Sequence, residues 1–245
     1  MNDSPPELRP PERRHGAENR SGGGQGMPAE APLRQALCRV MSEIHRRGWC
    51  DGTGGNFSCV LLREPTRLLM APSGVDKGRV RPGDLLLVDG EGTVLQGGGA
   101  ASAETRLHLT IIESCRAGAV LHTHSQAATL LSGLFGPPSG SAAAGAVVLK
   151  DLEMLKGLQG ISSHAETVRL PVLANDQNLT RLSARARPLL PDAPWGLLIA
   201  GHGLYAWGED LAMARRHLEI HEFLLEQQWR QLMLELLVRS AGPTG

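Results

Sequence analysis

The sequence predicts a layered α/β domain whose sheet is mixed or mainly antiparallel. Three observations predict it: apolar residues recur at helical spacing near both ends of the chain, short apolar or alternating runs between them suit strands, and short glycine-bearing turns join several of these runs. Helices that flank hairpin-linked strands can cover the faces of one sheet. The 245 residues permit one large domain or two small ones, and they show no internal repeat.

The N-terminal segment differs in composition from the rest of the chain. Residues 1–27 are rich in proline, glycine and charge, which predicts a flexible tail because few apolar groups could offset the entropy of ordering. From Pro32 onwards apolar residues recur at helical spacing, at Leu33, Leu37, Val40, Met41 and Ile44. We therefore expect a single domain over residues 28–240, followed by a short C-terminal tail at 241–245.

The next segment predicts a strand meander with two polar loops. Phe57, Cys59 and Leu61 alternate after the glycine-rich turn GWCDGTGGN, and RLLMAPSGVDKG predicts a strand that ends in a polar loop. The segment DLLLVDGEGTVL predicts two strands around a turn of Asp-Gly and Glu-Gly.

The second half alternates helical and strand patterns. A helix is expected from Ala103 to Arg116, then a buried strand in AVLHTHS, an apolar run from Ala127 to Leu134, and a loop in FGPPSGSAAAGA. Residues 165–173 predict a strand and LLIAGHGLYAWG predicts a hairpin. The segment from Leu211 to Val238 predicts a long amphipathic helix with its apolar side chains near one face, at Leu218, Leu225, Trp229, Leu232 and Leu236.

Charge and cysteine content narrow the function classes. The 25 Lys and Arg balance 25 Asp and Glu, so we expect neither nucleic acid nor anionic membrane as a partner. No run approaches the ~20 apolar residues that span a bilayer, and no secretory signal is apparent, so a cytoplasmic location is expected. The four cysteines form no CxxC pair and are expected to be reduced core residues, at Cys38, Cys50, Cys59 and Cys115.

Three histidines form a candidate metal site. His122 and His124 lie two residues apart on a predicted strand, so their side chains leave the same face about 6.6 Å apart. Catalytic zinc commonly has three protein ligands, and His202, between Gly201 and Gly203 in a predicted turn, is the candidate third ligand. In the alternative interpretation the pair is only hydrogen-bonded and His202 caps a surface turn.

Five motifs occur in an order and spacing that resemble the class II aldolase/adducin family: TGGNFS, APSGVDKG, SAE, GAVLHTHS and GHGLYAWG. The resemblance covers residues 31 to 238. It implies a three-layer α/β/α fold with a central, largely antiparallel sheet. It also implies one Zn²⁺ per subunit on His122, His124 and His202, and commonly a homotetramer with sites near subunit boundaries.

Two carboxylates match different branches of this family. The segments DLEMLKGLQG, LLMAPSGVDKG and GLYAWGE resemble the dehydratases that act on a methylthio ketose phosphate in methionine salvage. That resemblance implies that Glu153 is the catalytic acid/base, whereas Glu104 matches the corresponding carboxylate of the aldolases. The alternatives are an aldolase or epimerase of another ketose phosphate, and a non-catalytic adducin-like interaction domain. Without the resemblance, the pattern around Glu153 indicates a solvated helical residue.

Two loops are candidates for binding a phosphate. Backbone N–H groups in glycine-rich loops and a nearby cation suit a phosphate monoester. The resemblance places the phosphate between these loops, and the expected substrate-binding residues are Thr53, Gly54, Gly55, Asn56, Ser73, Gly74, Lys77 and Ser102. Neither loop matches a P-loop or a dinucleotide fingerprint, which argues against nucleotides. Ordinary turns with a solvated Lys77 remain the alternative.

Overall fold

A computed structural model describes residues 30–240. The predicted tails, 1–27 and 241–245, lie outside the described residues. The helices are α1 (Glu30–Arg46), α2 (Thr105–Cys115), α3 (Gln126–Phe135), α4 (Leu179–Ala186) and α5 (Leu211–Ser240), with short 3₁₀ turns η1 (Pro82–Asp84), η2 (Glu153–Gly157) and η3 (Leu190–Asp192). The strands are β1 (Asn56–Arg63), β2 (Thr66–Met70), β3 (Leu86–Asp89), β4 (Val94–Gln96), β5 (Ala119–Thr123), β6 (Ala144–Leu149), β7 (Val168–Leu173), β8 (Gly196–Ile199) and β9 (Gly203–Gly208).

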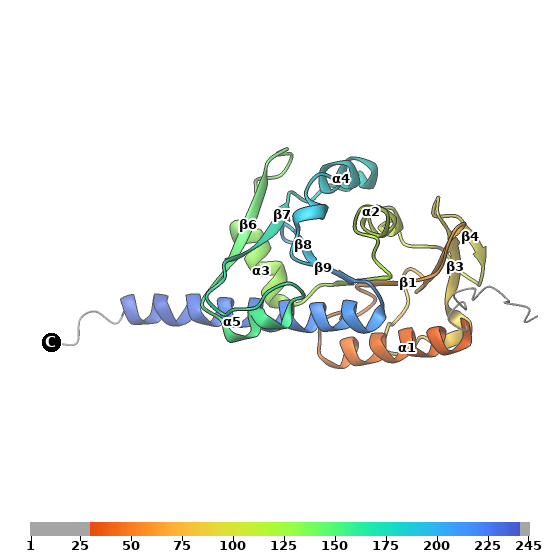
Figure 1. The fold of residues 1–245 in the computed structure, drawn as a ribbon, viewed down its shortest axis with the longest axis horizontal. Helices are drawn as coiled ribbons and strands as arrows, with labels where there is room; N and C mark the ends of the chain where they lie inside the picture. Colours follow the sequence, from red (N-terminus) through yellow and green to blue (C-terminus); the bar gives the residue numbers. More distant parts are fainter. Residues whose placement is uncertain (1–29, 241–245) are drawn as a thin grey trace, which may run out of the picture.

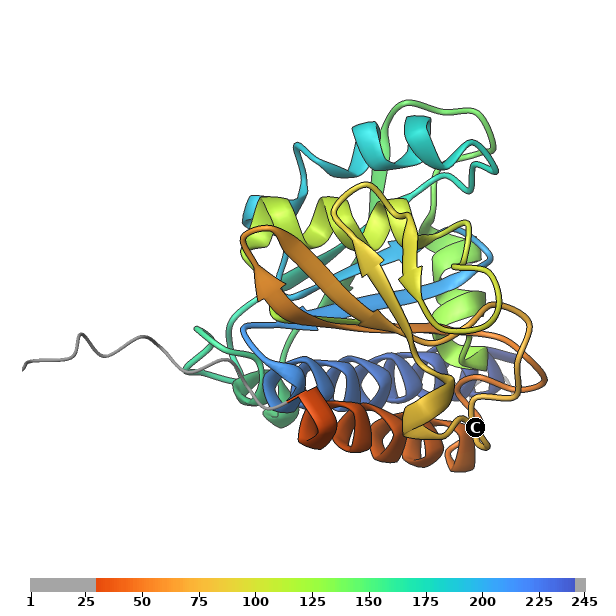
Figure 2. The same ribbon diagram turned by 90° about the vertical axis from the view of Figure 1, so that its right-hand side faces the viewer.

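All nine strands form one sheet, in the order β4-β3-β2-β1-β5-β9-β8-β7-β6. Every neighbouring pair is antiparallel except β7 and β8, which are parallel. Helices α1 and α5 lie along one face of the sheet, whereas α2 and α4 lie on the other (Figure 1). The view at right angles shows the same three layers (Figure 2). The predicted fold class, three-layer α/β/α with a largely antiparallel sheet, is confirmed.

Each face of the sheet has its own apolar core. Side chains of α1, α3 and α5 pack with β1, β5 and β9 on one face, and side chains of α2 and α4 pack on the other. Strand β5 lies near the middle of the sheet, so all five of its residues are buried. This burial explains why AVLHT begins as a continuous apolar run before its histidine and does not alternate.

Several predicted elements are confirmed in detail. Helix α1 buries Leu37, Val40, Met41 and Ile44, the residues at helical spacing, and begins at Glu30. The predicted hairpin at DLLLVDGEGTVL is β3 and β4, and its turn is closed by Asp89, whose Oδ1 accepts hydrogen bonds from two backbone amides of the turn at 2.8 and 2.9 Å. A short side chain that binds its own turn in this way is typical of Asp.

The structure corrects three parts of the sequence interpretation. The loop expected in FGPPSGSAAAGA ends early, because β6 begins at Ala144 and pairs with β7 at the edge of the sheet. Small residues have weak strand propensity, so this pairing depends on tertiary context. Helix α4 was not predicted. In α5, Leu218 and Leu225 are buried but Leu236 is 61% exposed, because the helix extends beyond the sheet (Figure 1).

The length of α5 does not make it a membrane helix. Among residues 30–240, no helix is both long enough and apolar enough to cross a bilayer.

A buried carboxyl group joins α5 to the central strand. Glu222 is 3% exposed, and its Oε1 accepts a hydrogen bond from Thr123 Oγ1 at 2.5 Å. Burial raises the pKa of Glu222 to about 7, against a smaller opposing effect of hydrogen bonds from Ser125 and Thr123. Because Thr123 and Ser125 flank His124, this contact anchors the segment that carries two of the candidate ligands.

We predict that Glu222→Gln is more stable than the wild type and that this stability difference increases as pH rises. A folded-state pKa above the unfolded value of about 4.3 means that the native state holds the proton more tightly, so stability falls as pH rises from about 4 towards 7. Glutamine keeps the shape and cannot ionise. The stability difference between variant and wild type should therefore grow by up to about 3 kcal/mol between pH 4 and pH 8.

Urea unfolding at several pH values measures this difference. Glu235→Gln, on the exposed end of α5, is the matched control and should give a difference that stays within about 0.5 kcal/mol at all pH values. A constant difference for Glu222→Gln would contradict the assignment of a buried, proton-binding carboxyl.

Candidate metal centre

The pairing of β5 with β9 brings the three histidines together. His122 lies opposite Tyr205 and Thr123 lies opposite Leu204, so the end of β5 meets the start of β9. His124 follows β5 directly, and His202 lies in the turn that joins β8 to β9. The turn places Gly201 at φ +62, and a Cβ on Gly203 would lie 2.0 Å from the Thr123 carbonyl oxygen. Both flanking glycines are therefore needed, as the sequence predicts.

The three imidazoles converge through their Nε2 atoms. The Nε2 of His122 lies 2.9 Å from that of His124 and 3.3 Å from that of His202, and the remaining pair is 3.1 Å apart. Two nitrogens at ~2.0–2.1 Å from one tetrahedral zinc ion would be about 3.4 Å apart. The three nitrogens therefore fit a single divalent metal with small adjustments.

The surroundings of His122 and His124 keep these two rings neutral. Nδ1 of His122 lies 2.9 Å from the Leu204 carbonyl oxygen, which can only accept, so Nδ1 carries the proton and Nε2 keeps its lone pair. Burial lowers the pKa of His122 well below its usual value. Burial also lowers the pKa of His124 to about 4, helped by the nearby His202 and Lys77. Neutral imidazole is the form that binds metals.

Glu104 lies directly beside the imidazoles. Its Oε1 is 3.2 Å from Nε2 of His202 and its Oε2 is 3.6 Å from Nε2 of His122. Burial raises the pKa of Glu104, and the neighbouring His202 opposes this shift. The Asn56 amide donates a hydrogen bond to the carboxylate. Asn56 was expected to bind phosphate. In the structure its side chain hydrogen-bonds to Glu104.

Tyr205 completes the buried side of the site and was not predicted as a functional residue. Its ring stacks on that of His122 with centroids 3.9 Å apart and an interplanar angle of 13°. The side chain is fully buried, and burial together with the nearby Glu104 raises its pKa well above the usual value. The sequence contained no direct signal for this contact, because it depends on the register between β5 and β9.

Glu153 lies outside this cluster within the chain. It begins η2, where its side chain is 71% exposed and forms an ion pair with Lys156 that lowers its pKa. Of the described residues, Glu104 lines the pocket beside His124 and His202, and Glu153 does not. The structure therefore brings Glu104, but not Glu153, to the histidines of the same protomer.

The two candidate phosphate loops lie next to each other and next to the histidines. Lys77 is 1% exposed and donates hydrogen bonds to the carbonyl oxygens of Thr53 at 3.0 Å and Val75 at 2.9 Å. It is thus not a solvated side chain, because its ammonium group ties the two loops together. A Cβ on Gly54 would lie 3.0 Å from Nδ1 of His124.

The remaining predicted phosphate ligands border the same region. A Cβ on Gly55 would lie 2.8 Å from the His122 carbonyl oxygen, so this loop packs directly against the backbone of a candidate metal ligand. Ser73 and Gly74 are exposed, and Ser102 Oγ accepts a hydrogen bond from the Glu104 amide at 3.2 Å. Phosphate binding by these groups stays a prediction.

Comparisons with known proteins identify the family of the chain. The family model described as "Class II Aldolase and Adducin N-terminal domain" matches residues 35–229. A methylthioribulose-1-phosphate dehydratase from Picosynechococcus sp. is 40% identical over 208 residues, which cover 82% of this chain and 93% of the relative. The enzyme of the same name from Methylococcus capsulatus is 44% identical over 190 residues, covering 76% of this chain and 88% of the relative.

A solved structure shares the fold. The structure of YgbL from Escherichia coli superposes with a TM-score of 0.67 at 27% identity, covering 82% of this chain and 89% of that chain. The residues matched by the family model include all three histidines and Glu104. The chain belongs to the class II aldolase and adducin family.

Proposed function

We propose that this protein is a metal-dependent methylthioribulose-1-phosphate dehydratase, a hydro-lyase of methionine salvage. Two relatives that carry this name are 40% and 44% identical to the chain over most of their length, which supports the assignment. The substrate is a ketose with phosphate on C1, a ketone at C2, hydroxyls on C3 and C4, and a methylthio group on C5. Loss of water gives the 2,3-diketone.

The observation that carries the proposal is the convergence of three imidazoles, two of them held neutral by burial, beside the mostly buried carboxyl group of Glu104. The Nε2 atoms lie 2.9–3.3 Å apart, and Glu104 Oε1 lies 3.2 Å from one of them. We propose that the site holds one Zn²⁺ per subunit, which when bound polarises the C2 ketone and makes the C3 hydrogen acidic. When ionised, Glu104 places negative charge next to the imidazoles, which favours binding of a divalent cation.

The reaction requires a group that moves a proton. Dehydration removes a proton from C3 and hydroxide from C4, and the resulting enol becomes the C3 ketone by taking up a proton at C4. An acid/base carboxyl can take the C3 proton and return it to the departing C4 oxygen, which is worth about 10²–10⁴-fold in rate. We propose Glu153 for this step because the segment DLEMLKGLQG resembles the dehydratases, and not because of its position in this protomer.

Because Glu153 is exposed and separate from the histidines of its own chain, it would reach a site only in a second copy. We therefore propose that the protein works as a homo-oligomer, a tetramer by family resemblance, in the cytoplasm. The phosphate would lie against the two loops tied by Lys77, whose buried ammonium group adds positive charge there.

A second candidate function is supported by the position of Glu104. A carboxylate this close to the imidazoles suits an aldolase or epimerase that moves protons on another ketose phosphate. An adducin-like interaction domain is disfavoured, since it has no use for three imidazoles that converge through their Nε2 atoms.

The direct test is turnover by the zinc-loaded protein. We expect methylthioribulose 1-phosphate to be converted to its diketone, with loss of one water seen by mass spectrometry, and other ketose 1-phosphates to react at least about 100-fold more slowly. His122→Ala should lose activity by more than about 10³-fold, because it removes a ligand held by the strand pairing. Carbon–carbon cleavage of a plain ketose phosphate, without dehydration, would establish the aldolase alternative instead.

A mixing experiment tests whether Glu153 acts in a neighbouring copy. Glu153→Gln and His122→Ala should each be inactive as purified proteins. Dissociated and reassembled together, they should recover up to about a quarter of the wild-type activity per site, because some sites then combine intact histidines with an intact Glu153.

The controls for that experiment distinguish the role of Glu104 from that of Glu153. Mixing Glu104→Gln with His122→Ala should recover no activity, because both residues belong to the same site in one protomer. If Glu153→Gln were fully active while Glu104→Gln was inactive, the assignment of the acid/base step to Glu153 would be wrong, and the dehydratase mechanism would fail with it.

A further inference from the structure

A hollow of about 500 Å³ opens beside the metal centre. One wall is formed by Glu104, His124 and His202, and the rest is lined by Gln126, Thr129, Asn175, Gln177 and Gly201. None of the lining residues comes from the two loops expected to bind phosphate. A substrate with its phosphate at those loops and its ketone at the metal position would therefore extend its remaining carbons into this hollow.

The wall facing the histidines is polar and uncharged. Thr129 Oγ1 donates a hydrogen bond to the His202 carbonyl oxygen at 3.1 Å, so this side chain supports the metal ligand. Asn175 and Gln177 are joined by one long hydrogen bond, from Gln177 Nε2 to Asn175 Oδ1 at 3.4 Å. Within residues 30–240 neither side chain makes another hydrogen bond, which leaves Asn175 Nδ2 as a donor and Gln177 Oε1 as an acceptor for a ligand.

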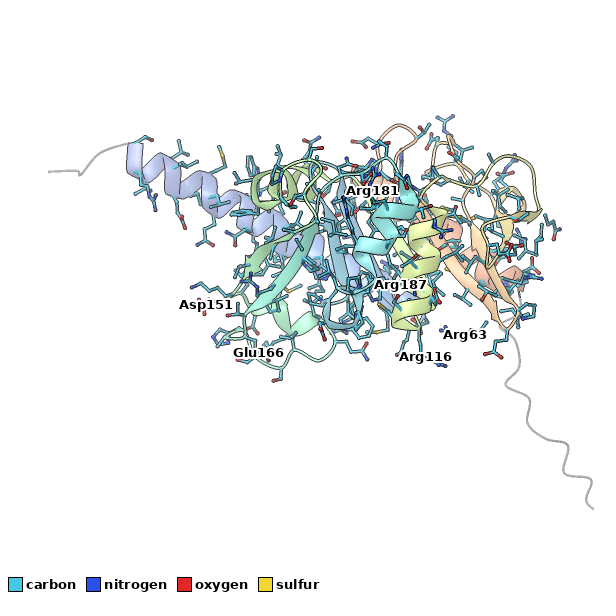
Figure 3. All side chains as sticks on the ribbon, turned by 90° about the horizontal axis from the view of Figure 1, so that it is seen from above. Arg63, Arg116, Asp151, Glu166, Arg181 and Arg187 are labelled. Atoms are coloured by element: carbon cyan, nitrogen blue, oxygen red, sulfur yellow. The ribbon has the colours of Figure 1, made fainter. Side chains whose placement is uncertain are left out.

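The loop that carries both amides is held firmly from behind. Asp176, between them, has a side chain only 8% exposed, and its carboxylate accepts hydrogen bonds from Arg181 Nη2 at 2.6 Å and Arg185 Nη1 at 3.3 Å. The pKa of Asp176 is lowered to about 2, chiefly by the bond from Arg181 and then by the Asn178 amide. Arg181 projects from the start of α4 (Figure 3).

The same loop is fixed to the helix and the sheet. Asn178 Oδ1 accepts a hydrogen bond from the Arg181 amide at 3.0 Å and caps α4, and the Ala200 amide donates to Leu173 at the end of β7 at 2.8 Å. Alternation along this short loop turns Asp176 towards α4 and its two neighbours towards the hollow. A binding group on a pinned loop loses little conformational entropy when it meets a ligand.

We infer that Asn175 and Gln177 are specificity-determining residues that bind the C4 hydroxyl group of the ketose. This inference rests on the proposed function, since it names the part of the ketose phosphate that occupies the hollow. A neutral amide pair offers one donor and one acceptor, which matches a sugar hydroxyl and provides no cation for a second phosphate or carboxylate. Asp176 acts as a positioning residue that holds the pair.

Two ligands of different length test the inference. Dihydroxyacetone phosphate contains the phosphate and the ketone but ends before C4, whereas methylthioribulose 1-phosphate carries the C4 hydroxyl. Asn175→Ala and Gln177→Ala should each lower kcat/KM for the five-carbon substrate about 3–10-fold, the loss expected for one hydrogen bond. The Kd of dihydroxyacetone phosphate, measured by calorimetry on the zinc-loaded protein, should change less than about twofold.

The controls separate recognition from general damage. Gln231→Ala removes an exposed amide on α5 and should change neither value. Gln177 is itself exposed, so Gln177→Ala should fold normally even if Asn175→Ala does not. Asp176→Asn should reproduce the selective loss, because its weaker bonds to the arginines release the loop.

Equal losses for both ligands, or no loss for either, would overturn the inference while leaving the proposed function intact. If the wild-type protein binds dihydroxyacetone phosphate but does not turn over the five-carbon substrate, the proposed function fails, and the inference fails with it.

Discussion

The antiparallel pairing of β5 with β9 is the constraint on which the site depends. It sets His122 opposite Tyr205 and brings the turn that carries His202 against the end of β5. A shift of one residue would turn His122 to the other face and separate the three Nε2 atoms. Gly203, which lies against the Thr123 carbonyl, and Glu222, which binds the Thr123 hydroxyl from α5, both act on this pairing. The candidate metal centre thus lies where the central strand β5 ends and β9 begins, and the strand pairing fixes the position of its histidines.

Burial gives the groups of the site complementary protonation states. The imidazoles of His122 and His124 are kept neutral, whereas burial favours the protonated form of Glu104 unless a cation is near. Three imidazole nitrogens that converge beside one carboxyl group form a set that a divalent metal would stabilise. By contrast, Asp176 is ionised next to two arginines and serves to hold a loop. Carboxyl groups of the same protein therefore have different roles, because their surroundings set their protonation states.

The sequence alone was sufficient to predict features that depend on local pattern. The spacing of His122 and His124, the glycines around His202 and the hairpins at DLLLVDGEGTVL and LLIAGHGLYAWG all follow from neighbouring residues. Contacts set by tertiary packing could not be predicted in this way: the stacking of Tyr205 on His122, the bond from Asn56 to Glu104, or the pairing that makes β6 a strand. The sequence left a solvated Lys77 open as an alternative, yet Lys77 is buried because two loops fold over it. The sequence around Glu153 resembles the dehydratases, but this local match could not predict where Glu153 lies. Its separation from the histidines of its own chain is set by the fold.

The central claim is that His122, His124 and His202 bind one divalent metal and leave a position for the substrate. X-ray absorption at the zinc edge of the loaded protein tests it most directly. The claim predicts three nitrogen ligands at ~2.0–2.1 Å plus oxygen, and a change in the oxygen ligands alone when a ketose 1-phosphate is added. Sulfur ligands at ~2.3 Å, or a first shell that is the same in His122→Ala and wild type, would contradict it.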